Sequence, residues 1–396
     1  MKKLIALLIC IAMMASVVGC RSSDPQEEAG SSNDASADEE NSGLTTLPGD
    51  LDIEDYTYSN DYGIDFEAAF AIFEPDTLML TIGEYEVRWA EMYFYLRSNA
   101  NMILLNFGGA VEWSEMFYDD TTIADFVQSY ALENAQMYKS FEHGGNIMGI
   151  SLNSEDLDSI QMEFDMLSMT YGGEDEFLKI LWEQDGCYSR ELFDYLIGIS
   201  FLANRIFLEY YGEDGELLSD EAAAEIVENE GYLMAKHILI LRDEEDEENA
   251  ALSEAEFILA QLESYIGSEF DWVFDEMMYS FSEDAGGMMS YPEGYLFQYG
   301  DMVNEFYEAC VALEVGEISG IVETNYGYHI IYRLPINYDI IPYSNAMYGD
   351  YRTLRVYAAA IHFDEVLFEW RDSLPVVQSA EYESIDIATL FAFSNS

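Results

Sequence analysis

Basic residues are scarce in this sequence of 396 residues: 15 lysines and arginines stand against 78 aspartates and glutamates, a formal net charge of −63. Proteins that bind nucleic acids neutralise phosphates with clustered basic side chains, and the sequence has no such cluster. A nucleic-acid partner is therefore excluded. The same charge favours solubility and attracts cationic partners, but it does not determine the fold.

Motifs of the common hydrolases and transferases are absent, since the sequence has no GxSxG, P-loop, HExxH or CxxC pattern. Histidine is rare, and the four present are residues 143, 237, 329 and 362. A zinc site built from histidine and cysteine has little support, so we expect no metal and no cofactor. The acidic runs lack the alternating aspartates and central glycine of a tight calcium loop, which leaves only loose calcium binding open.

Long apolar runs are limited to the N-terminus. Lys2 and Lys3 precede the apolar stretch 4–18, which is too short and too one-sided for an ordinary membrane-spanning helix. The ending Val-Val-Gly-Cys resembles a bacterial lipobox, which predicts a lipoprotein signal peptide over 1–19 and lipidation of Cys20. The alternative is an ordinary secretory peptide in which Cys20 is incidental. No other segment has 18 uninterrupted apolar residues, so we expect a lipid anchor alone.

The two remaining cysteines in the exported part are Cys187 and Cys310. They fall in regions that we interpret as different domains. A disulfide is possible in an exported protein but is not implied by the spacing. Two separate packed thiols are the favoured interpretation.

The segment 20–70 is rich in Ser, Asp, Glu, Asn and Gly, and it has few aliphatic residues before Leu44. Such a composition predicts a disordered acidic tether. A flexible tether behind a lipid anchor would let the following domains work at some distance from a membrane.

Residues 71–228 are predicted to form a mainly helical domain. A strand pair around 78–87 turns at Gly83 and Glu84, and helical periodicity follows. The expected helices are 89–105, 121–143 ending at Gly144, 154–171 capped by Ser154, 189–211 and 219–229.

Residues 229–336 have the pattern of strands and helices that is typical of a compact α/β domain. Its expected strands are 232–241, 317–324 and 328–334, and its expected helices are 251–266, 270–278 and 302–313. A Gly/Ser/Met-rich loop is expected after the second helix. The C-terminal segment 337–396 returns to helix over 346–373, followed by a short strand-like stretch at 376–387.

The α/β region resembles a known family. The segments AKHILI, YSFSED, EGYLFQYGDMVNEFYEACVALEVGEIS and VETNYGYHIIYRL are similar, in order and spacing, to the parvulin-type peptidyl-prolyl isomerases. The segment YGGEDEFLKILWEQDGCYSRELFDYL looks like the helical chaperone region of exported parvulins. With the lipobox, the whole resembles PrsA-type extracytoplasmic foldase lipoproteins.

The resemblance implies an α+β fold in which a helical chaperone-like domain, made from the N-terminal region and a C-terminal helix packing back on it, carries an inserted parvulin-like domain. That insert would be a small antiparallel sheet surrounded by helices. The implied activity is isomerisation of X–Pro bonds, which needs no nucleophile or metal. The catalyst must only bind the twisted amide better than either planar form.

The family's site residues carry over by position. Met302 and Phe306, spaced i, i+4, would form the floor that holds the proline ring; the alternative is plain core packing. His237 and His329 match the paired histidines below the substrate amide, with Thr324 beside them. Each histidine alone is better explained as a satisfied core residue, but both at matching positions favour an orienting network.

Asp284 falls where the family has a catalytic Cys or Asp. The alternative is a solvated loop acid, and neighbouring Glu283 makes the alignment ambiguous by one residue. The loop 291–296 departs from the family's Gly-Gly-Asp-Leu-Gly pattern, so Tyr295 or Leu296 would supply the apolar lid. Where some parvulins read phosphate with basic residues, this chain has the acidic run 243–248, which excludes phosphopeptide specificity.

The leading hypothesis is a lipid-anchored, extracytoplasmic foldase that isomerises prolyl bonds in unfolded exported proteins, with neutral or basic client segments and a monomeric or dimeric state. The first alternative is a holdase chaperone whose parvulin-like domain only binds. The second is a lipid-anchored binding protein for a small cationic ligand, which leaves the ordered series of motifs unexplained.

Overall fold

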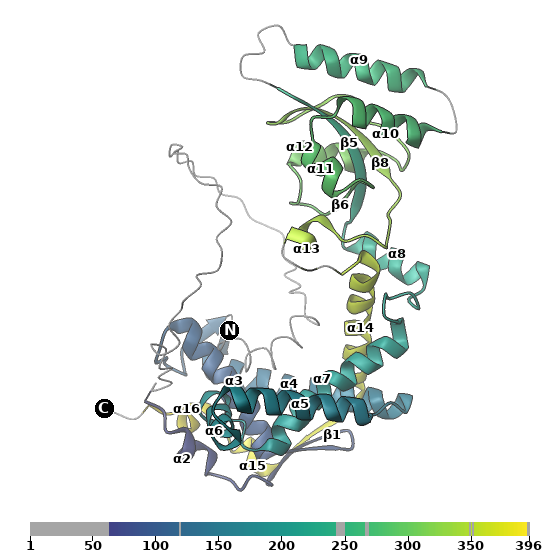
Figure 1. Ribbon diagram of the computed structural model, residues 1–396. Helices are drawn as coiled ribbons and strands as arrows, with labels where there is room; N and C mark the ends of the chain where they lie inside the picture. Colours follow the sequence, from purple (N-terminus) through teal and green to yellow (C-terminus); the bar gives the residue numbers. More distant parts are fainter. Residues whose placement is uncertain are drawn as a thin grey trace. The chain divides into compact units, whose positions relative to one another are not determined.

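The computed structural model describes residues 63–118, 120–242, 250–265, 269–347, 350 and 352–393. The predicted signal peptide, Cys20, the tether up to residue 62 and the acidic run 243–248 lie outside these residues. The described chain divides into two compact units (Figure 1). We call the residues up to Ile206 together with those from Val366 the discontinuous unit, and Phe207–Glu365 the inserted unit.

The discontinuous unit is mainly helical. Its elements are α2 (Phe66–Phe70), β1 (Leu78–Ile82), β2 (Tyr85–Arg88), α3 (Trp89–Phe107), β3 (Met116–Tyr118), β4 (Thr121–Thr122), α4 (Ile123–Met148), α5 (Ser154–Thr170), α6 (Glu174–Asp185), most of α7 (Arg190–Tyr211), the end of α14 (Leu354–Ser373), β9 (Val376–Gln378), α15 (Ala380–Glu383) and α16 (Ile387–Leu390).

Residues from both ends of the described chain share this unit's core. Strand β9 pairs antiparallel with β1, with Leu80 opposite Gln378. Phe391 packs edge-on against Phe66, and the Trp113 indole N–H donates to the Phe391 carbonyl over 2.8 Å. Because Phe66 is buried within α2, ordered structure begins before residue 71, and the predicted tether is too long at its C-terminal end.

Two helix boundaries in this unit differ from those predicted. Helix α4 runs through Gly144 and ends at Gly149, whose φ of 70° gives the left-handed C-cap. A Cβ at Gly144 would lie 2.1 Å from Trp370 Cζ3, so this glycine makes room for a neighbouring helix rather than ending its own. Helix α5 is capped by Asn153, whose side chain accepts from the N–H groups of Glu155 and Asp156, and not by Ser154.

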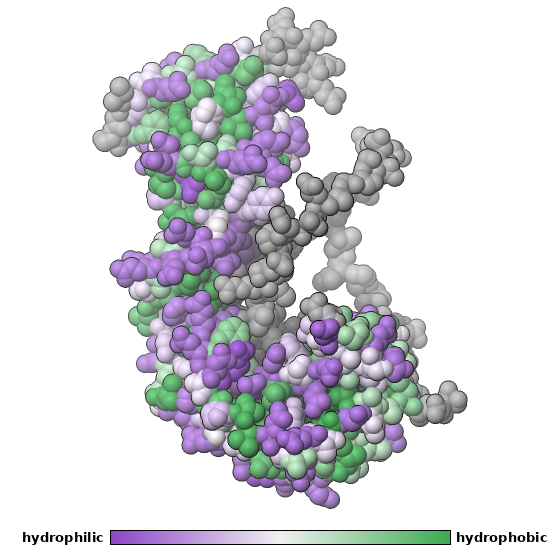
Figure 2. Space-filling model, turned by 180° about the vertical axis from the view of Figure 1, so that it is seen from behind, coloured by the Kyte–Doolittle hydropathy of each residue, from purple (hydrophilic) through white to green (hydrophobic). Residues whose placement is uncertain are grey.

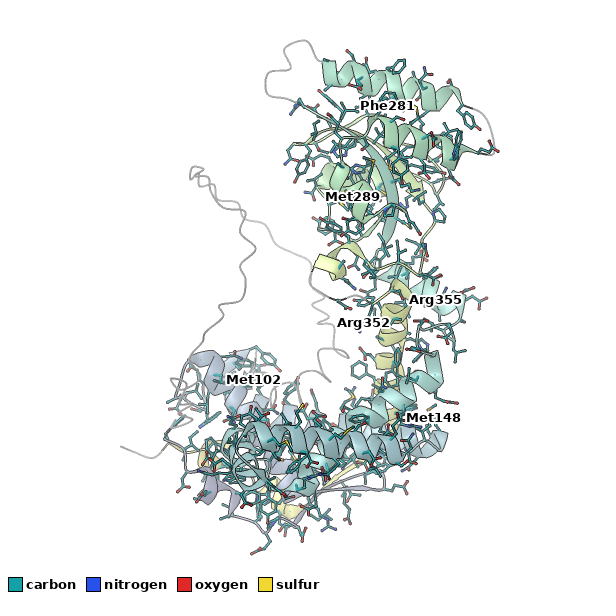
Figure 3. All side chains as sticks on the ribbon, in the orientation of Figure 1. Met102, Met148, Phe281, Met289, Arg352 and Arg355 are labelled. Atoms are coloured by element: carbon teal, nitrogen blue, oxygen red, sulfur yellow. The ribbon has the colours of Figure 1, made fainter. Side chains whose placement is uncertain are left out.

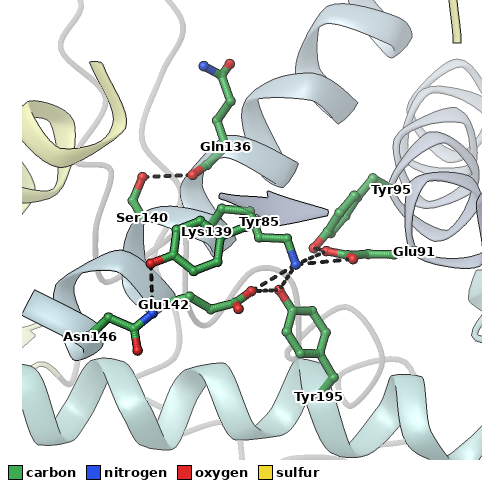
Figure 4. A network of polar contacts seen from close by, with 9 residues as sticks. All are labelled: Tyr85, Glu91, Tyr95, Gln136, Lys139, Ser140, Glu142, Asn146 and Tyr195. Atoms are coloured by element: carbon green, nitrogen blue, oxygen red, sulfur yellow. Dashed lines mark hydrogen bonds and ion pairs between the residues drawn. The ribbon is translucent and has the colours of Figure 1, made fainter. Parts of the chain in front are cut away.

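A buried ion-pair network joins three helices of this unit (Figure 4). The Lys139 ammonium lies 3.0 Å from Glu91 Oε1 and 2.9 Å from Glu142 Oε1, and it donates to the Tyr195 hydroxyl over 2.7 Å. Its side chain is only 5% exposed. Burial raises the pKa of Glu91, and the neighbouring Lys139 opposes that rise. Lys139 thus compensates negative charge that the core would otherwise hold alone.

The inserted unit is built around one four-stranded sheet. Beyond the end of α7, its elements are α8 (Asp220–Asn229), β5 (Leu233–Leu241), α9 (Ala250–Ser264), α10 (Phe270–Phe281), α11 (Ala285–Ser290), β6 (Tyr295–Phe297), α12 (Asn304–Ala312), β7 (Val322–Glu323), β8 (Gly327–Leu334), α13 (Tyr343–Met347) and most of α14. The sheet order is β6-β5-β8-β7, and every neighbouring pair is antiparallel.

Strict alternation along β5 and β8 assigns the two faces of this sheet. Ile238 and Ile330 face a core made with α9 and α10. Ala235 and Ile331 face the opposite way, against Phe306 and Cys310 of α12. Both faces are therefore apolar and covered, which explains why β5 has an almost unbroken hydrophobic sequence instead of a polar alternation.

The predicted α+β fold class is confirmed, but some local predictions for the inserted unit are wrong. The expected loop after the second helix contains the short helix α11, and the strand β6 follows it. The helix expected from Met302 begins at Asn304, so Met302 precedes it. Short elements of three to six residues have too little periodicity to be detected by pattern alone.

Hydrophilic and apolar residues are interspersed over the face drawn in Figure 2. Among the described residues, no helix is long and apolar enough to cross a membrane. Cys187 and Cys310 are both free and buried.

We predict that Lys139→Met lowers the unfolding free energy of the discontinuous unit by about 3–5 kcal/mol, because it leaves the Glu91 carboxylate buried without its cation. Urea unfolding followed by tryptophan fluorescence measures this, since four of the five tryptophans lie in this unit.

Lys179→Met is the matched control. Lys179 is 57% exposed and lies 3.8 Å from both Glu176 and Glu183, so its loss should change stability by about 0.5 kcal/mol or less. Equal effects of the two substitutions would contradict the assignment of the Lys139 network as a buried ion pair.

Candidate active site

Two histidines meet on the sheet face that α12 covers. In the antiparallel pairing of β5 with β8, Leu239 lies opposite His329 and His237 lies opposite Ile331, which places both imidazoles on the same face. Their Nδ1 atoms are 2.9 Å apart, and the ring planes are nearly parallel at 13°. His237 is 9% exposed and His329 is 4% exposed. The predicted histidine pair is therefore a direct, buried contact.

The segment after α10 brings Asp284 to this pair. The Glu283 N–H donates to the Leu239 carbonyl over 2.8 Å, and the Leu239 N–H donates to Ser282 Oγ over 3.1 Å. These bonds fix the segment along β5, beside His237. Asp284 Oδ2 consequently lies 2.8 Å from His237 Nε2.

The Asp284 carboxylate has two further donors. The Tyr295 hydroxyl donates to Oδ2 over 2.7 Å, and the Gly287 N–H donates to Oδ1 over 3.0 Å. The hydrogen bond from His237 is the main cause that holds the pKa of Asp284 well below its usual range, and the bonds from Tyr295 and Gly287 act in the same direction. Asp284 is thus an ionised, oriented carboxylate at neutral pH.

Thr324 closes the other end of the network. Its Oγ1 lies 2.8 Å from His329 Nε2 and accepts from the Tyr326 N–H over 3.1 Å. Thr324 is 4% exposed, so its hydroxyl depends on these protein partners.

The protonation of His329 and Asp284 bears on which atom donates in each of these hydrogen bonds. Burial, reinforced by the nearby His237, lowers the pKa of His329 to about 4, so this imidazole is neutral at pH 7. With Asp284 ionised and one proton on each imidazole, His237 Nε2–H donates to Asp284, His329 Nδ1–H donates to His237 Nδ1, and the Thr324 hydroxyl donates to His329 Nε2. Each donor in this series of hydrogen bonds then faces an acceptor.

Phe306 forms an apolar floor beside the two imidazoles. It is 2% exposed, and its ring lies edge-on to His237 at 5.2 Å and to His329 at 5.6 Å between centroids. Met302 is partly buried against the same cluster. Both residues belong to one packed cluster, but the predicted shared helix face is wrong, because Val303 is the N-cap of α12 and Met302 precedes it.

The two alternatives for the lid, Tyr295 and Leu296, lie on opposite faces of the sheet. Tyr295 lies by the site, with its ring 5.6 Å from that of His237. Leu296 is 1% exposed and packs instead with Val227, Tyr232, Met234 and Leu354. Because successive residues of a strand point to opposite faces, β6 can contribute only one of them. Leu296 is therefore a core residue away from the site.

Two tyrosines near the site were not predicted. Tyr291 lies 4.8 Å from Tyr295 between ring centroids, and Tyr343 lies 5.6 Å from Tyr295 and 5.3 Å from Tyr291. Tyr343 belongs to α13, beyond the predicted domain boundary at 336, and no sequence pattern connects it to the site. Together the three rings make an aromatic wall beside Asp284.

These contacts define what the site can do chemically. It offers an apolar floor, a fixed carboxylate and a pair of imidazoles, of which His237 holds that carboxylate in place. Among the described residues, no group of His, Cys, Asp and Glu is suited to hold a metal ion. The described site is therefore suited to binding an apolar ring and imposing an electric field on it.

Comparisons with known proteins agree with this geometry. Residues 237–334 match the family described as "Rotamase: PPIC-type PPIASE domain". The segment is therefore a parvulin-type rotamase domain, and the resemblance inferred from the sequence is confirmed.

The wider chain is similar to proteins named "Foldase protein PrsA". The one from Halalkalibacterium halodurans is 26% identical over 227 residues, which cover 54% of this chain and 57% of that protein. The one from Staphylococcus epidermidis is 30% identical over 168 residues, covering 41% and 46%. The chain thus matches about half the length of these relatives. A solved peptidylprolyl isomerase (PrsA) from Bacillus cereus is 18% identical, with 70% of this chain and 98% of that chain covered, at a TM-score of 0.30.

We predict that His329 stays neutral down to about pH 4, with its proton on Nδ1. Its pKa in the folded protein lies below the ordinary 6.5, so the stability that neutral His329 contributes is complete above pH 6.5 and is lost as the pH falls from 6.5 towards 4. Long-range ¹H–¹⁵N NMR, with signals assigned by comparison with His329→Gln, reports both tautomer and midpoint. A midpoint near 6.5 would contradict the buried network.

Proposed function

We propose that this protein is a peptidyl-prolyl cis–trans isomerase that assists the folding of exported proteins. The observation that carries the proposal is the continuous network Thr324–His329–His237–Asp284, which lies against the Phe306 ring. The match of residues 237–334 to the PPIC-type rotamase family supports it. The foldases to which the wider chain is similar support the role in folding.

The reaction requires rotation about a C–N bond that resonance keeps planar, and its uncatalysed barrier is about 18–20 kcal/mol. Phe306 and Met302 hold the proline ring while the preceding residue rotates. Asp284 holds a fixed negative charge beside the amide. In the planar amide the carbonyl oxygen carries extra negative charge through resonance, so a carboxylate near that oxygen favours the twisted form, in which this charge is reduced.

The histidines have a positioning role in this mechanism. His237 donates to Asp284 and fixes its orientation, while His329 and Thr324 fix the tautomer of His237. No proton is transferred to the substrate. Because neutral His329 adds no positive charge, it supports His237 without weakening the field of the carboxylate.

The proposed setting is extracytoplasmic. Residues 1–19 act as the signal peptide, lipid on Cys20 anchors the chain to a membrane, and the part of the predicted 20–70 segment that precedes α2 is the tether. The discontinuous unit holds unfolded segments while the inserted unit isomerises their X–Pro bonds. Clients are neutral or basic, because the net charge of −63 repels acidic chains.

A holdase without isomerase activity is the second candidate. The loop 291–296 favours it, because Tyr291 and Tyr295 pack with Tyr343 where the family has a glycine-rich segment. Bulky rings there would narrow the access of a proline-containing chain to Asp284. A holdase would suppress aggregation of a client without accelerating its proline-limited refolding.

We predict that Asp284→Asn lowers isomerase activity by about tenfold or more, because it removes the negative charge that favours the twisted amide, and a loss of about 1.4 kcal/mol of transition-state stabilisation corresponds to a factor of ten. The measurement is cis–trans exchange of a short X–Pro peptide by NMR, with the soluble chain lacking the signal peptide.

Glu283→Gln is the matched control. Glu283 is exposed, and its Oε2 accepts from the Leu241 N–H over 2.6 Å, an interaction that a glutamine side chain can keep. It should retain wild-type activity, which also resolves which of the two adjacent acids acts. If the unmodified chain shows no exchange above background but still suppresses aggregation, the holdase function replaces the isomerase function.

A further inference from the structure

An exposed aromatic surface lies in the discontinuous unit, where α3 ends and the β3–β4 hairpin begins. We call it the hairpin patch. Its exposed members are Leu105 (43%), Phe107 (55%), Met116 (53%), Phe117 (37%) and Tyr118 (52%). All three residues of β3 are exposed. Figure 3 labels Met102 on α3, one turn before this patch begins.

The rings of the patch form one contiguous series. Phe117 lies 6.2 Å from Phe107, 5.5 Å from Tyr118 and 4.7 Å from Phe126, measured between centroids. Phe126 in turn stacks on Tyr130 at 5.4 Å. Single exposed apolar residues are common on protein surfaces, whereas contiguous groups mark binding surfaces.

The backbone beneath the patch is firmly held. Trp113 is 3% exposed, and its indole N–H donates to the Phe391 carbonyl over 2.8 Å. The Ile123 N–H donates to the Glu115 carbonyl and the Ala124 N–H to the Trp113 carbonyl, each over 2.9 Å, which ties the hairpin to the start of α4. The rings are thus presented by a preorganised scaffold, which lowers the entropy cost of binding.

The charged residues in the stretch of sequence that carries the patch have one sign. Between Arg97 and Lys139 the sequence contains no lysine or arginine. The exposed acids Glu112, Glu115, Asp120 and Asp125 lie in the same stretch. The surface therefore combines aromatic rings with an acidic surround, which complements a ligand that is both apolar and cationic.

This charge identifies the kind of occupant. A second copy of the chain would bring another strongly acidic surface, and the segment 21–62 has Arg21 as its one base among many acids. Like charges disfavour both. We propose that the hairpin patch binds extended, unfolded polypeptide segments in which aromatic or aliphatic residues alternate with lysine or arginine. The inference rests on the proposed function, because it takes unfolded chains as the ligands, and it gives them a binding site apart from the isomerase site.

The test uses a fluorescent peptide without proline, in which Phe and Leu alternate with Lys, and a matched peptide with Glu in place of Lys. The Lys peptide should bind at least about tenfold more tightly than the Glu peptide at low salt, and the difference should shrink as salt screens the acids. Because neither peptide contains proline, this readout is independent of isomerase catalysis.

The variant Phe107→Ser with Tyr118→Ser removes two exposed rings and should weaken binding of the Lys peptide by at least about tenfold. Val377→Ser is the control, since Val377 is 62% exposed in the same unit but on β9. It should bind as the unmodified chain does. Isomerase activity on a short X–Pro peptide should be equal in the unmodified chain, the double variant and the Val377→Ser control. Equal activity would show that the inserted unit is intact.

Three results would overturn the proposal: unchanged binding in the double variant, equal binding of the Lys and Glu peptides, or self-association in sedimentation that the double variant abolishes. The last would make the patch an interface between copies. If the unmodified chain shows no isomerase activity but binds the Lys peptide, the proposed catalysis is refuted and the hairpin patch remains a client-binding site.

Discussion

The antiparallel register of β5 against β8 is the constraint on which the site depends. It places His237 and His329 on one face, and a slip of one residue would send one imidazole to the opposite core. Gly327 helps to fix this register. A Cβ there would lie 2.1 Å from the Ile240 carbonyl oxygen, and its φ of 151° suits glycine, so a larger residue would force β8 away from β5. Apolar cores on both faces then lock the pairing.

Burial and charge act together within this register. Burial away from water disfavours a second proton on His329, and so does the neighbouring His237, whose Nδ1 lies 2.9 Å from His329 Nδ1. His329 is therefore neutral. The carboxylate is positioned by β5, because the bonds to Leu239 fix the segment that carries it, and by the first turn of α11, where the Gly287 N–H donates to Asp284 Oδ1. The network thus takes its geometry from backbone pairing that the sheet makes in any case.

Much of this could be predicted from the sequence, and the exceptions share a cause. His237, His329, Thr324 and Asp284 were identified because each belongs to a motif of fixed spacing. Leu296 was misplaced because the strand β6 has three residues, too few to show which face each one takes. Gly144 was predicted to end a helix, whereas it makes room for Trp370. That contact could not be predicted, because Trp370 lies more than two hundred residues away in the sequence. Tyr343 has no local signal at all. Contacts between distant segments are not encoded in local patterns.

The extreme acidity acquires a physical role when the two proposed client sites are considered together. Neither surface identifies a sequence by itself, since an apolar floor and a row of rings accept many side chains. The acidic residues of the hairpin patch and the net charge of −63 add discrimination, because they favour neutral or basic segments over acidic ones. Screening confines this preference to charges within about 8–10 Å of the surface, so it acts on the bound segment rather than on the whole client. In the proposed function, the charge would therefore select segments of unfolded chain, while the inserted unit would act on the proline within them.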